Sequence, residues 1–256
     1  MSLYDIIKQN THELGGLKLP LVLGTDVQGK NRFKDLVDLE HILMAGSTGS
    51  GKSVFENTII TTLLQLLPPS EIRFFLVDMK RVDLVSYRDL PQLYTEVLVD
   101  AKQVLTSLDL LIKEKERRLT IHNKNYPFII VIIDTISDLM EYDSNTFEEI
   151  LAHLIPEAIK VKIHVIISDS RSSVQVFTQK IRKYFPTRVC FNLSNAADEA
   201  LILESQYSGA DKLRGKGDML FLPPGALIPE RIQAPFISEK EISQIIESQG
   251  KIKLNK

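Results

Sequence analysis

Residues 46–53 constrain this chain more than any other part of its sequence, because they read Gly-Ser-Thr-Gly-Ser-Gly-Lys-Ser. This run satisfies the G-x-x-x-x-G-K-[ST] pattern of a phosphate-binding loop, and an apolar, strand-like run precedes it while a helix-like stretch follows. Its glycines let the backbone turn tightly enough for successive N–H groups to converge on an anion. The N-terminus of the following helix adds partial positive charge. The motif therefore predicts a site for a nucleoside triphosphate.

Two residues at the end of this motif have predicted chemical roles. Lys52 is expected to reach the β and γ phosphates. Ser53 is expected to place its hydroxyl on a magnesium ion, which prefers oxygen ligands and usually keeps several waters. ATP and Mg²⁺ are therefore the expected cofactors. The residues expected to contact the nucleotide are Gly46, Ser47, Thr48, Gly49, Ser50, Gly51, Lys52, Ser53 and Val54.

Residues 128–134 supply an acidic element that complements the phosphate loop. Six apolar residues end in Asp134, which is the Walker B pattern. In that pattern the buried strand fixes the carboxylate, and the carboxylate holds the magnesium ion. A strand-end aspartate could by itself simply cap a turn, but beside a complete phosphate loop Asp134 is expected to bind the metal.

The residue after Asp134 is Thr135, whereas many motor ATPases carry a glutamate there that accepts a proton from the attacking water. A threonine hydroxyl cannot accept that proton at neutral pH. Asp138 and Glu141 follow within two helical turns and are candidate substitutes. The sequence thus predicts nucleotide binding more directly than it predicts hydrolysis.

The rest of the chain alternates short apolar runs with amphipathic stretches, which predicts an α/β fold with a RecA-like, mostly parallel sheet flanked by helices on both faces. Strands are expected at 41–45, 73–78, 96–99, 128–134, 163–168, 188–192 and 219–222. Helices are expected at 3–14, 51–67, 100–122, 145–161, 174–184, 195–204 and 239–249, the last one capped by Ser238. Residues 21–33 contain a Gln-Gly turn signal and read as a small hairpin.

Composition narrows the setting. Apolar residues at 44% and charged residues at 25% exclude a disordered, collagenous or coiled-coil chain. The lone cysteine, Cys190, cannot form an internal disulfide, which fits a reducing cytoplasmic setting. No apolar run approaches the roughly 18 residues of a membrane span, so the chain is not expected to insert into a membrane directly. A net charge of −2 means that any nucleic-acid contact must come from a local patch.

Beyond the phosphate loop, motifs spread over residues 19–236 resemble the motor domain of the FtsK/SpoIIIE family of DNA translocases. They are an entry hairpin at 23–30, Val77-Asp78-Met79-Lys80 with Asp83-Leu84, Glu116-Arg117-Arg118, Asp134 with Asp138-Leu139-Met140, Pro186-Thr187-Arg188, and Gly215-Lys216-Gly217-Asp218-Met219-Leu220. Methionine stands where the family has proline in the second of these.

The resemblance implies an ATP-dependent motor that moves double-stranded DNA as a hexameric ring, a homo-oligomer that grips the duplex through its phosphates. It divides the chain into an N-terminal helix and hairpin (1–33), a RecA-type motor domain (34–238) and a C-terminal helix and tail (239–256). The family's membrane segments and winged-helix domain would lie outside this stretch. It also implies that Lys80 and Asp83 lie near the nucleotide or the subunit joint.

Three departures from the family pattern fall on one chemical step. Thr135 replaces the catalytic glutamate, Ser170 replaces a glutamine expected to sense the γ phosphate, and Ala200 replaces an arginine that could reach a neighbouring nucleotide. Arg171 and Arg188 are the candidates to supply that missing positive charge to a neighbouring subunit's nucleotide. With Lys52 and Asp134, these two arginines form the predicted catalytic set.

Two other functions remain open at this stage. The chain could be a degenerate, non-hydrolysing ATP-binding subunit with a structural or regulatory role in a DNA-transfer or type VII secretion-like machine. It could also be an export motor with a polypeptide cargo. Thr135 and Ala200 favour the first of these.

Lys180, Arg182 and Lys183, followed by Tyr184, are the candidate DNA contacts. Phosphate gripping needs only cations, hydroxyls and backbone N–H groups on loops that face the duplex. A solvated basic helix face is the competing interpretation of the same residues.

Overall fold

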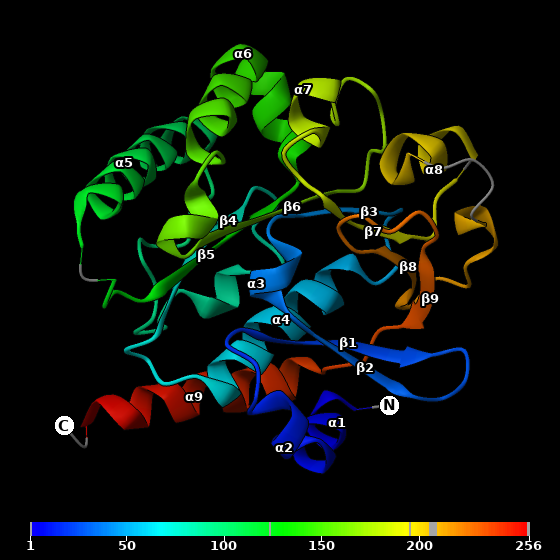
Figure 1. Ribbon diagram of the computed structural model, residues 1–256, viewed down its shortest axis with the longest axis horizontal. Coiled ribbons are helices and arrows are strands. Elements are labelled where there is room, and N and C mark those ends of the chain that lie inside the picture. The colour runs from blue at the N-terminus through cyan, green and yellow to red at the C-terminus, as the bar shows by residue number, and fades with distance from the viewer. Residues whose placement is uncertain (1, 123, 195, 205–208, 255–256) are drawn as a thin grey trace.

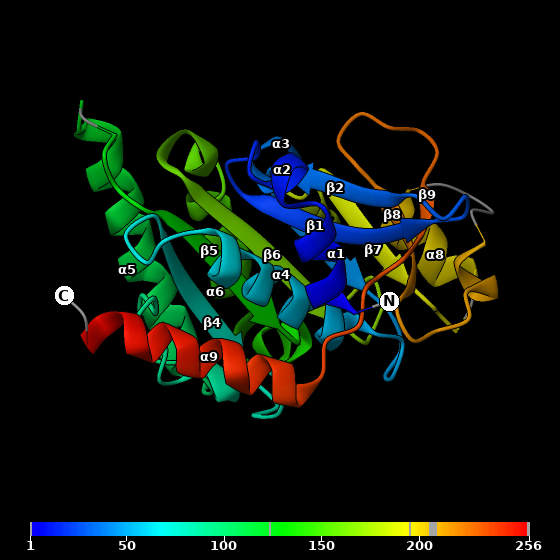
Figure 2. The same ribbon diagram turned by 90° about the horizontal axis from the view of Figure 1, so that it is seen from below.

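The computed structural model describes residues 2–122, 124–194, 196–204 and 209–254. In that part of the chain a nine-stranded sheet is covered by helices on both faces (Figures 1 and 2). The strands are β1 (Pro20–Asp26), β2 (Asn31–Asp35), β3 (Ile42–Ala45), β4 (Ile72–Asp78), β5 (Phe128–Asp134), β6 (Ile163–Asp169), β7 (Thr187–Phe191), β8 (Asp218–Leu222) and β9 (Glu230–Gln233). The α-helices are α1 (Leu3–Gln9), α2 (Thr11–Leu14), α3 (Leu36–Leu39), α4 (Lys52–Leu66), α5 (Ala101–Thr120), α6 (Ile136–Leu154), α7 (Gln179–Arg182), α8 (Ala196–Leu203) and α9 (Glu239–Leu254).

The strand order is β2-β1-β9-β8-β7-β3-β6-β5-β4. Strands β7, β3, β6, β5 and β4 are mutually parallel, because helical crossovers connect them. Strands β8, β9, β1 and β2 extend this parallel core as an antiparallel ribbon, in which each strand turns back on its neighbour. The predicted α/β sheet with helices on both faces is confirmed. The hairpins β1–β2 and β8–β9, from the two ends of the chain, both extend the parallel strands at the β7 edge.

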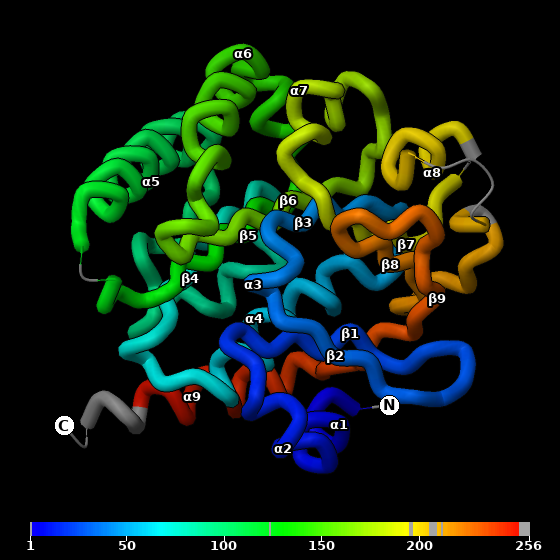
Figure 3. The backbone as a smooth tube through the Cα atoms, in the orientation of Figure 1, coloured from blue at the N-terminus to red at the C-terminus, as the bar shows by residue number. Residues whose placement is uncertain are grey.

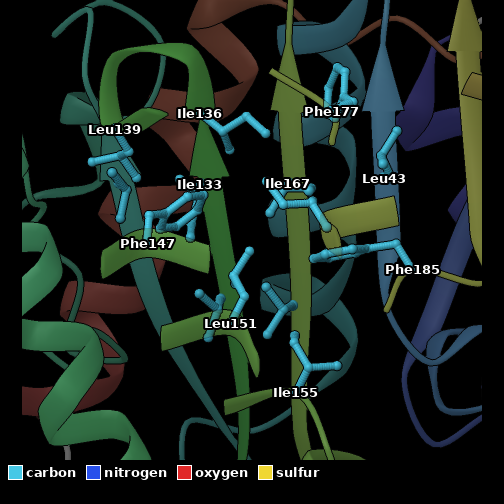
Figure 4. Packing of buried hydrophobic residues seen from close by; sticks show 14 of the residues in the cluster. Leu43, Ile133, Ile136, Leu139, Phe147, Leu151, Ile155, Ile167, Phe177 and Phe185 are labelled. Atoms are coloured by element: carbon cyan, nitrogen blue, oxygen red, sulfur yellow. The ribbon is translucent and has the colours of Figure 1, made fainter. Parts of the chain in front are cut away.

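Two apolar cores fill the space between the sheet and its helices. One lies under α5, α6, α7 and α8, where Ile133 and Ile167 of the sheet pack with Phe147 of α6 (Figure 4). The other lies under α1, α2, α4 and α9 and receives the alternate side chains of the same strands. Strands β5 and β6 are therefore buried on both faces, which explains their continuous apolar sequences.

The strand register shows which strand ends lie side by side at the carboxyl edge of the sheet. Ala45 at the end of β3 is paired with Asp169 at the end of β6, and Asp134 at the end of β5 is paired with Ser168. The phosphate loop, Asp134 and the segment after β6 thus leave the sheet at one edge. Ligands of open α/β sheets bind at this carboxyl edge.

Helix α6 begins earlier than the predicted 145–161. It starts at Ile136, directly after Thr135, and it contains a kink at Asp143, whose φ of −160° is not helical. The Asp143 carboxylate accepts hydrogen bonds from the backbone N–H and the hydroxyl of Thr146. That cap starts the second half of α6, and it is this second half that the sequence pattern detected.

Two other predicted elements are shorter than expected. Of the predicted helix 174–184, only α7 forms, because the Thr178 hydroxyl caps it by accepting a bond from the N–H of Ile181. The predicted strand 96–99 is reduced to a bridge between Val77 and Leu98 at the edge beside β4. By contrast, the predicted cap of the last helix is confirmed: the Ser238 hydroxyl accepts a bond from the N–H of Glu241.

The N-terminal end of the described chain packs beside the start of α9, whereas the other end of α9 lies far from it (Figure 3). The Ser2 hydroxyl donates to the Glu241 carboxylate of α9, and the N–H of Leu3 donates to the carbonyl of Phe236 at 3.0 Å. Helix α1 is therefore fastened to the segment between β9 and α9.

Candidate nucleotide-binding site

The predicted phosphate loop connects β3 to α4, and two of its glycines adopt conformations that favour glycine. Gly49 has φ of 77° and Gly51 has φ of 114°. The N–H of Ser47 donates to the carbonyl of Asn192, at the end of the adjacent β7, at 2.9 Å. The loop is thus held at the carboxyl edge of the sheet, directly before the N-terminus of α4.

The Gly-Lys-Gly segment at 215–217 packs against this loop. The N–H of Gly217 donates to the carbonyl of Ser50 at 2.8 Å. A Cβ atom on Gly51 would lie 2.4 Å from the Gly217 nitrogen, closer than any real Cβ contact. Two motifs that are far apart in the sequence therefore meet at a point where both need glycine.

Replacing Gly51 by alanine is expected to lower the free energy of unfolding by about 2 kcal/mol, because the new methyl group overlaps backbone that cannot move away cheaply. Urea denaturation monitored by circular dichroism measures this change. Gly225 is the matched control, since its φ of 75° is also positive but no atom of the described residues lies within 4 Å of its Cβ position. If Gly225→Ala destabilised the protein as much as Gly51→Ala, the close contact with Gly217 would not be the cause.

Lys52 is buried at the start of α4, and its ammonium group donates to the carbonyl of Gly46 at 2.7 Å. Burial lowers the pKa of Lys52, while the nearby Glu56 and Asp134 carboxyls act in the opposite direction. The loop's own carbonyl thus holds the cation where a bound phosphate would displace it.

Ser53 and Asp134, the two predicted metal-binding residues, line one cavity of about 610 Å³. The Ser53 hydroxyl donates to the Asp83 carboxylate at 2.8 Å, and the Asp134 carboxylate accepts a bond from the Ser168 hydroxyl at 2.9 Å. Burial raises the pKa of Asp134. The described residues that line the cavity are Thr48, Gly49, Gly51, Lys52, Ser53, Val54, Lys80, Val82, Asp83, Asp134, Ser170, Lys216, Gly217, Gln233, Ala234, Pro235 and Phe236.

This donor set fits magnesium. A hydroxyl and two carboxylates provide the oxygen ligands that Mg²⁺ prefers. No group of three or more His, Cys, Asp and Glu side chains in the described residues is arranged to hold a metal by itself. Mg²⁺ commonly binds through one or two carboxylates together with substrate phosphates and water, so such a closed cage is not required.

Thr135 lies at the junction of β5 and α6 in a left-handed conformation, with φ of 66°. Its hydroxyl is buried and has no hydrogen-bond partner within the described part of the chain. Asp138 and Glu141, the candidate replacements for the missing base, do not line the cavity among the described residues. Glu141 is also engaged in an ion pair with Arg171.

Burial raises the pKa of Asp138, and the nearby Asp169 carboxylate raises it further. Asp169 itself accepts bonds from the N–H groups of Ser137 and Arg171, so it orders the segment that follows β6. Of the two candidate bases, Asp138 is therefore the one not held by an arginine.

The two predicted catalytic arginines have different surroundings. Arg171 is exposed and ion-paired with Glu141. Arg188 is 6% exposed, and its guanidinium donates to the carbonyls of Arg182 and Ile202 and pairs with Glu204. Contrary to the sequence-based expectation, Arg188 does not present a free cation, because it lies inside the domain at the opposite end of β7 from the phosphate loop.

The predicted DNA contacts on α7 are largely paired with acidic groups. Lys180 is exposed but lies 2.9 Å from the Glu148 carboxylate, and Arg182 is paired with Glu204. Lys183 is exposed, with its ammonium 4.7 Å from the centre of the Tyr184 ring. These residues therefore form a partly neutralised surface.

Sequence reasoning missed two groups at this site. Glu56, on the same face of α4 as Lys52, is fully buried, and neither of its carboxylate oxygens has a hydrogen-bond partner in the described ranges. Its spacing of four residues from Lys52, on the same face of α4, was the available signal. The second group is the pair of apolar lining residues Pro235 and Phe236, for which the sequence offered no motif.

A sequence profile of the FtsK/SpoIIIE family matches residues 2–125 of this chain. Bacillus subtilis DNA translocase SftA is 36% identical over 96% of the chain, and B. subtilis DNA translocase SpoIIIE is 33% identical over 96% of it. The chain belongs to the FtsK/SpoIIIE family. It spans about a third of the length of these FtsK/SpoIIIE relatives: 28% of SftA and 34% of SpoIIIE.

Solved structures agree with this FtsK/SpoIIIE assignment at the level of the fold. The pCW3 conjugation coupling protein TcpA, solved with ATPγS, has a TM-score of 0.77 at 22% identity and covers 93% of this chain and 71% of its own. The type VII secretion ATPase EccC of Thermomonospora curvata has a TM-score of 0.76 at 16% identity and covers 91% of this chain and 31% of its own. Within the described ranges, no helix combines the length and apolar character needed to cross a bilayer.

Proposed function

We propose that this chain is the ATP-binding motor domain of a double-stranded DNA translocase, in which ATP binding and hydrolysis drive DNA movement. The observation that carries the proposal is one cavity that brings together the phosphate loop, Lys52, Ser53 and the strand-end Asp134. The names of the FtsK/SpoIIIE relatives support DNA as the cargo.

Each part of the cavity has a role in this proposal. The N–H groups of residues 46–53 and the ammonium of Lys52 would bind the phosphates, and the Lys52–Gly46 bond would be exchanged for a phosphate contact. Ser53 and Asp134 would hold Mg²⁺, which when bound neutralises charge on the phosphates. The Ser168 hydroxyl fixes the Asp134 carboxylate for that task.

The motor is proposed to work in the cytoplasm as a homo-oligomeric, hexameric ring around the duplex. Arg171 is the better candidate of the two arginines to reach a neighbouring copy's nucleotide, because it is exposed while Arg188 is buried. Lys180 and Lys183 are the better candidates for phosphate contacts, and duplex phosphates would compete with Glu148 for Lys180. Such contacts weaken steeply as salt rises.

A second candidate function is favoured by Thr135. Its hydroxyl cannot act as a base, and no carboxylate of Asp138 or Glu141 lines the described cavity. A chain that binds ATP without hydrolysing it at a useful rate would serve as a structural or regulatory subunit of a larger machine.

Calorimetry with Mg-ATP, followed by ATPase assays with and without long duplex DNA, tests the proposal. We expect ATP binding and a turnover that long duplex stimulates and high salt suppresses. The Lys52→Ala variant sets the background. ATP binding with a turnover that stays at this background, with or without duplex, would favour the non-hydrolysing subunit instead. Absence of heat on titration with Mg-ATP would refute the nucleotide site itself.

A further inference from the structure

The cavity at the phosphate loop is lined in part by apolar side chains. Pro235 and Phe236, in the segment that links β9 to α9, line it together with Val54 of α4. Phe236 is 59% exposed although it is a large aromatic residue. An exposed aromatic side chain that lines a cavity next to a phosphate loop calls for a ligand group that would cover it.

The backbone of this segment is fixed on both sides. The N–H of Ala234 donates to the carbonyl of Gly217 at 2.8 Å, and Gly217 in turn donates to the carbonyl of Ser50 in the phosphate loop. On the other side, the N–H of Leu3 donates to the carbonyl of Phe236. The backbone at Phe236 is thus positioned relative to the phosphate loop before any ligand binds.

The cavity also has polar and charged lining residues. Asp134, Asp83 and Lys80 are among them, and they are suited to phosphates and a metal ion. A nucleoside triphosphate carries its charge at one end and a flat aromatic base at the other. Once the loop binds the phosphates, the uncharged base can pack against the apolar side chains of Pro235 and Phe236. The cavity volume of about 610 Å³ is in the range of small-molecule sites.

We infer that Pro235 and Phe236, together with Val54, form the binding slot for the base of the nucleotide, with the Phe236 ring stacked on the base. The inference rests on the proposed nucleotide-binding function and adds the residues that hold the base. Base–aromatic stacking is tolerant of base identity because every base has a π face. The slot therefore supplies affinity for a nucleoside and not for its phosphates.

The test compares Mg-ATP with inorganic tripolyphosphate, which has the phosphates but lacks the base. In calorimetry, Phe236→Ala is expected to weaken ATP binding about tenfold and to leave tripolyphosphate binding within about twofold of wild type. Phe236→Tyr should restore ATP binding, because it keeps an aromatic ring. Leu227→Ala is the matched control, since Leu227 is 89% exposed and lies outside this cavity.

A second variant gives a direct readout. The chain contains no tryptophan, so Phe236→Trp introduces a single fluorophore at the slot. ATP should quench its fluorescence and tripolyphosphate should not, while a Leu227→Trp variant should respond to neither.

Equal ATP affinity of wild type and Phe236→Ala would overturn the inference while leaving the proposed function intact. An equal loss of ATP and tripolyphosphate affinity would also overturn it, because it would mean that the substitution distorts the phosphate loop. A wild-type chain that binds tripolyphosphate and ATP with no difference would assign no role to the base. A wild-type chain that binds neither would overturn the proposed function and this inference with it.

Discussion

ATP turnover by the Thr135→Glu variant is expected to exceed that of the wild-type chain by about two to four powers of ten, the usual contribution of a positioned general base. Position 135 directly follows the Asp134 carboxylate at the end of β5, where a carboxylate could accept the proton of the attacking water. The backbone there is left-handed, and a β-branched threonine is strained in that conformation. Glutamate is not β-branched, so the substitution also relieves strain. Steady-state ATPase assays with saturating duplex measure the gain.

Thr135→Gln is the matched control, because glutamine has the same shape as glutamate but cannot accept a proton. A gain in both variants would assign the effect to side-chain size, and no gain in either would contradict a missing base. If wild type turns over briskly and glutamate adds nothing, the base lies elsewhere. Asp138→Asn would then be the next variant, since Asp138 has a raised pKa, whereas Glu141 is ion-paired with Arg171.

The phosphate loop was predictable because its chemistry is local. Residues 46–53 carry the glycines, the lysine and the hydroxyl in one run, and strand β3 and helix α4 follow from the flanking apolar patterns. The contact between Gly51 and Gly217 was not predictable, although both motifs were visible. It depends on how β8 returns antiparallel to β7, and the sequence does not contain that pairing in any local signal.

Which cations form ion pairs could also not be predicted from the sequence. Arg188 and Lys180 look alike as cations in a sequence. Glu204, in the segment after α8, pairs with Arg188, and Glu148 of α6 pairs with Lys180. Only the packing of α6 and α7 above the sheet brings Glu148 to Lys180. The prediction of DNA contacts from a basic run was therefore limited by partners that are distant in the chain.

The burial of Glu56 also depends on packing between segments that are distant in the chain. A glutamate in a helix is usually solvated, so its burial could not be predicted from its residue type. Helix α4, however, is buried along most of its length between the sheet and α9, and Glu56 is fully buried with it. Neither oxygen of the Glu56 carboxyl has a hydrogen-bond partner in the described part of the chain.

Replacing Glu56 by methionine is expected to stabilise the protein by about 3 kcal/mol at pH 8, because it removes a buried polar group that no partner satisfies. Methionine is unbranched and of similar length, so it should fill the same space. Burial raises the pKa of Glu56 well above its ordinary value, and the nearby Asp134 carboxylate raises it further. Urea denaturation of both proteins between pH 4 and pH 8 measures the difference.

The sign of the pH dependence follows from that raised pKa. Above the pKa of about 4.3 that a glutamate has in an unfolded chain, the unfolded state releases the proton while the folded state still holds it. Wild type therefore loses stability relative to Glu56→Met as pH rises from about 4.3 towards the pKa of the folded state. Glu56→Gln separates the two contributions, since it keeps an unpaired polar group but cannot ionise: its stability should stay below that of Glu56→Met by an amount that does not change with pH. A stability difference between wild type and Glu56→Met that is the same at pH 4 and pH 8 would show that Glu56 ionises in the folded protein as it does in the unfolded chain, and that Lys52 compensates its charge.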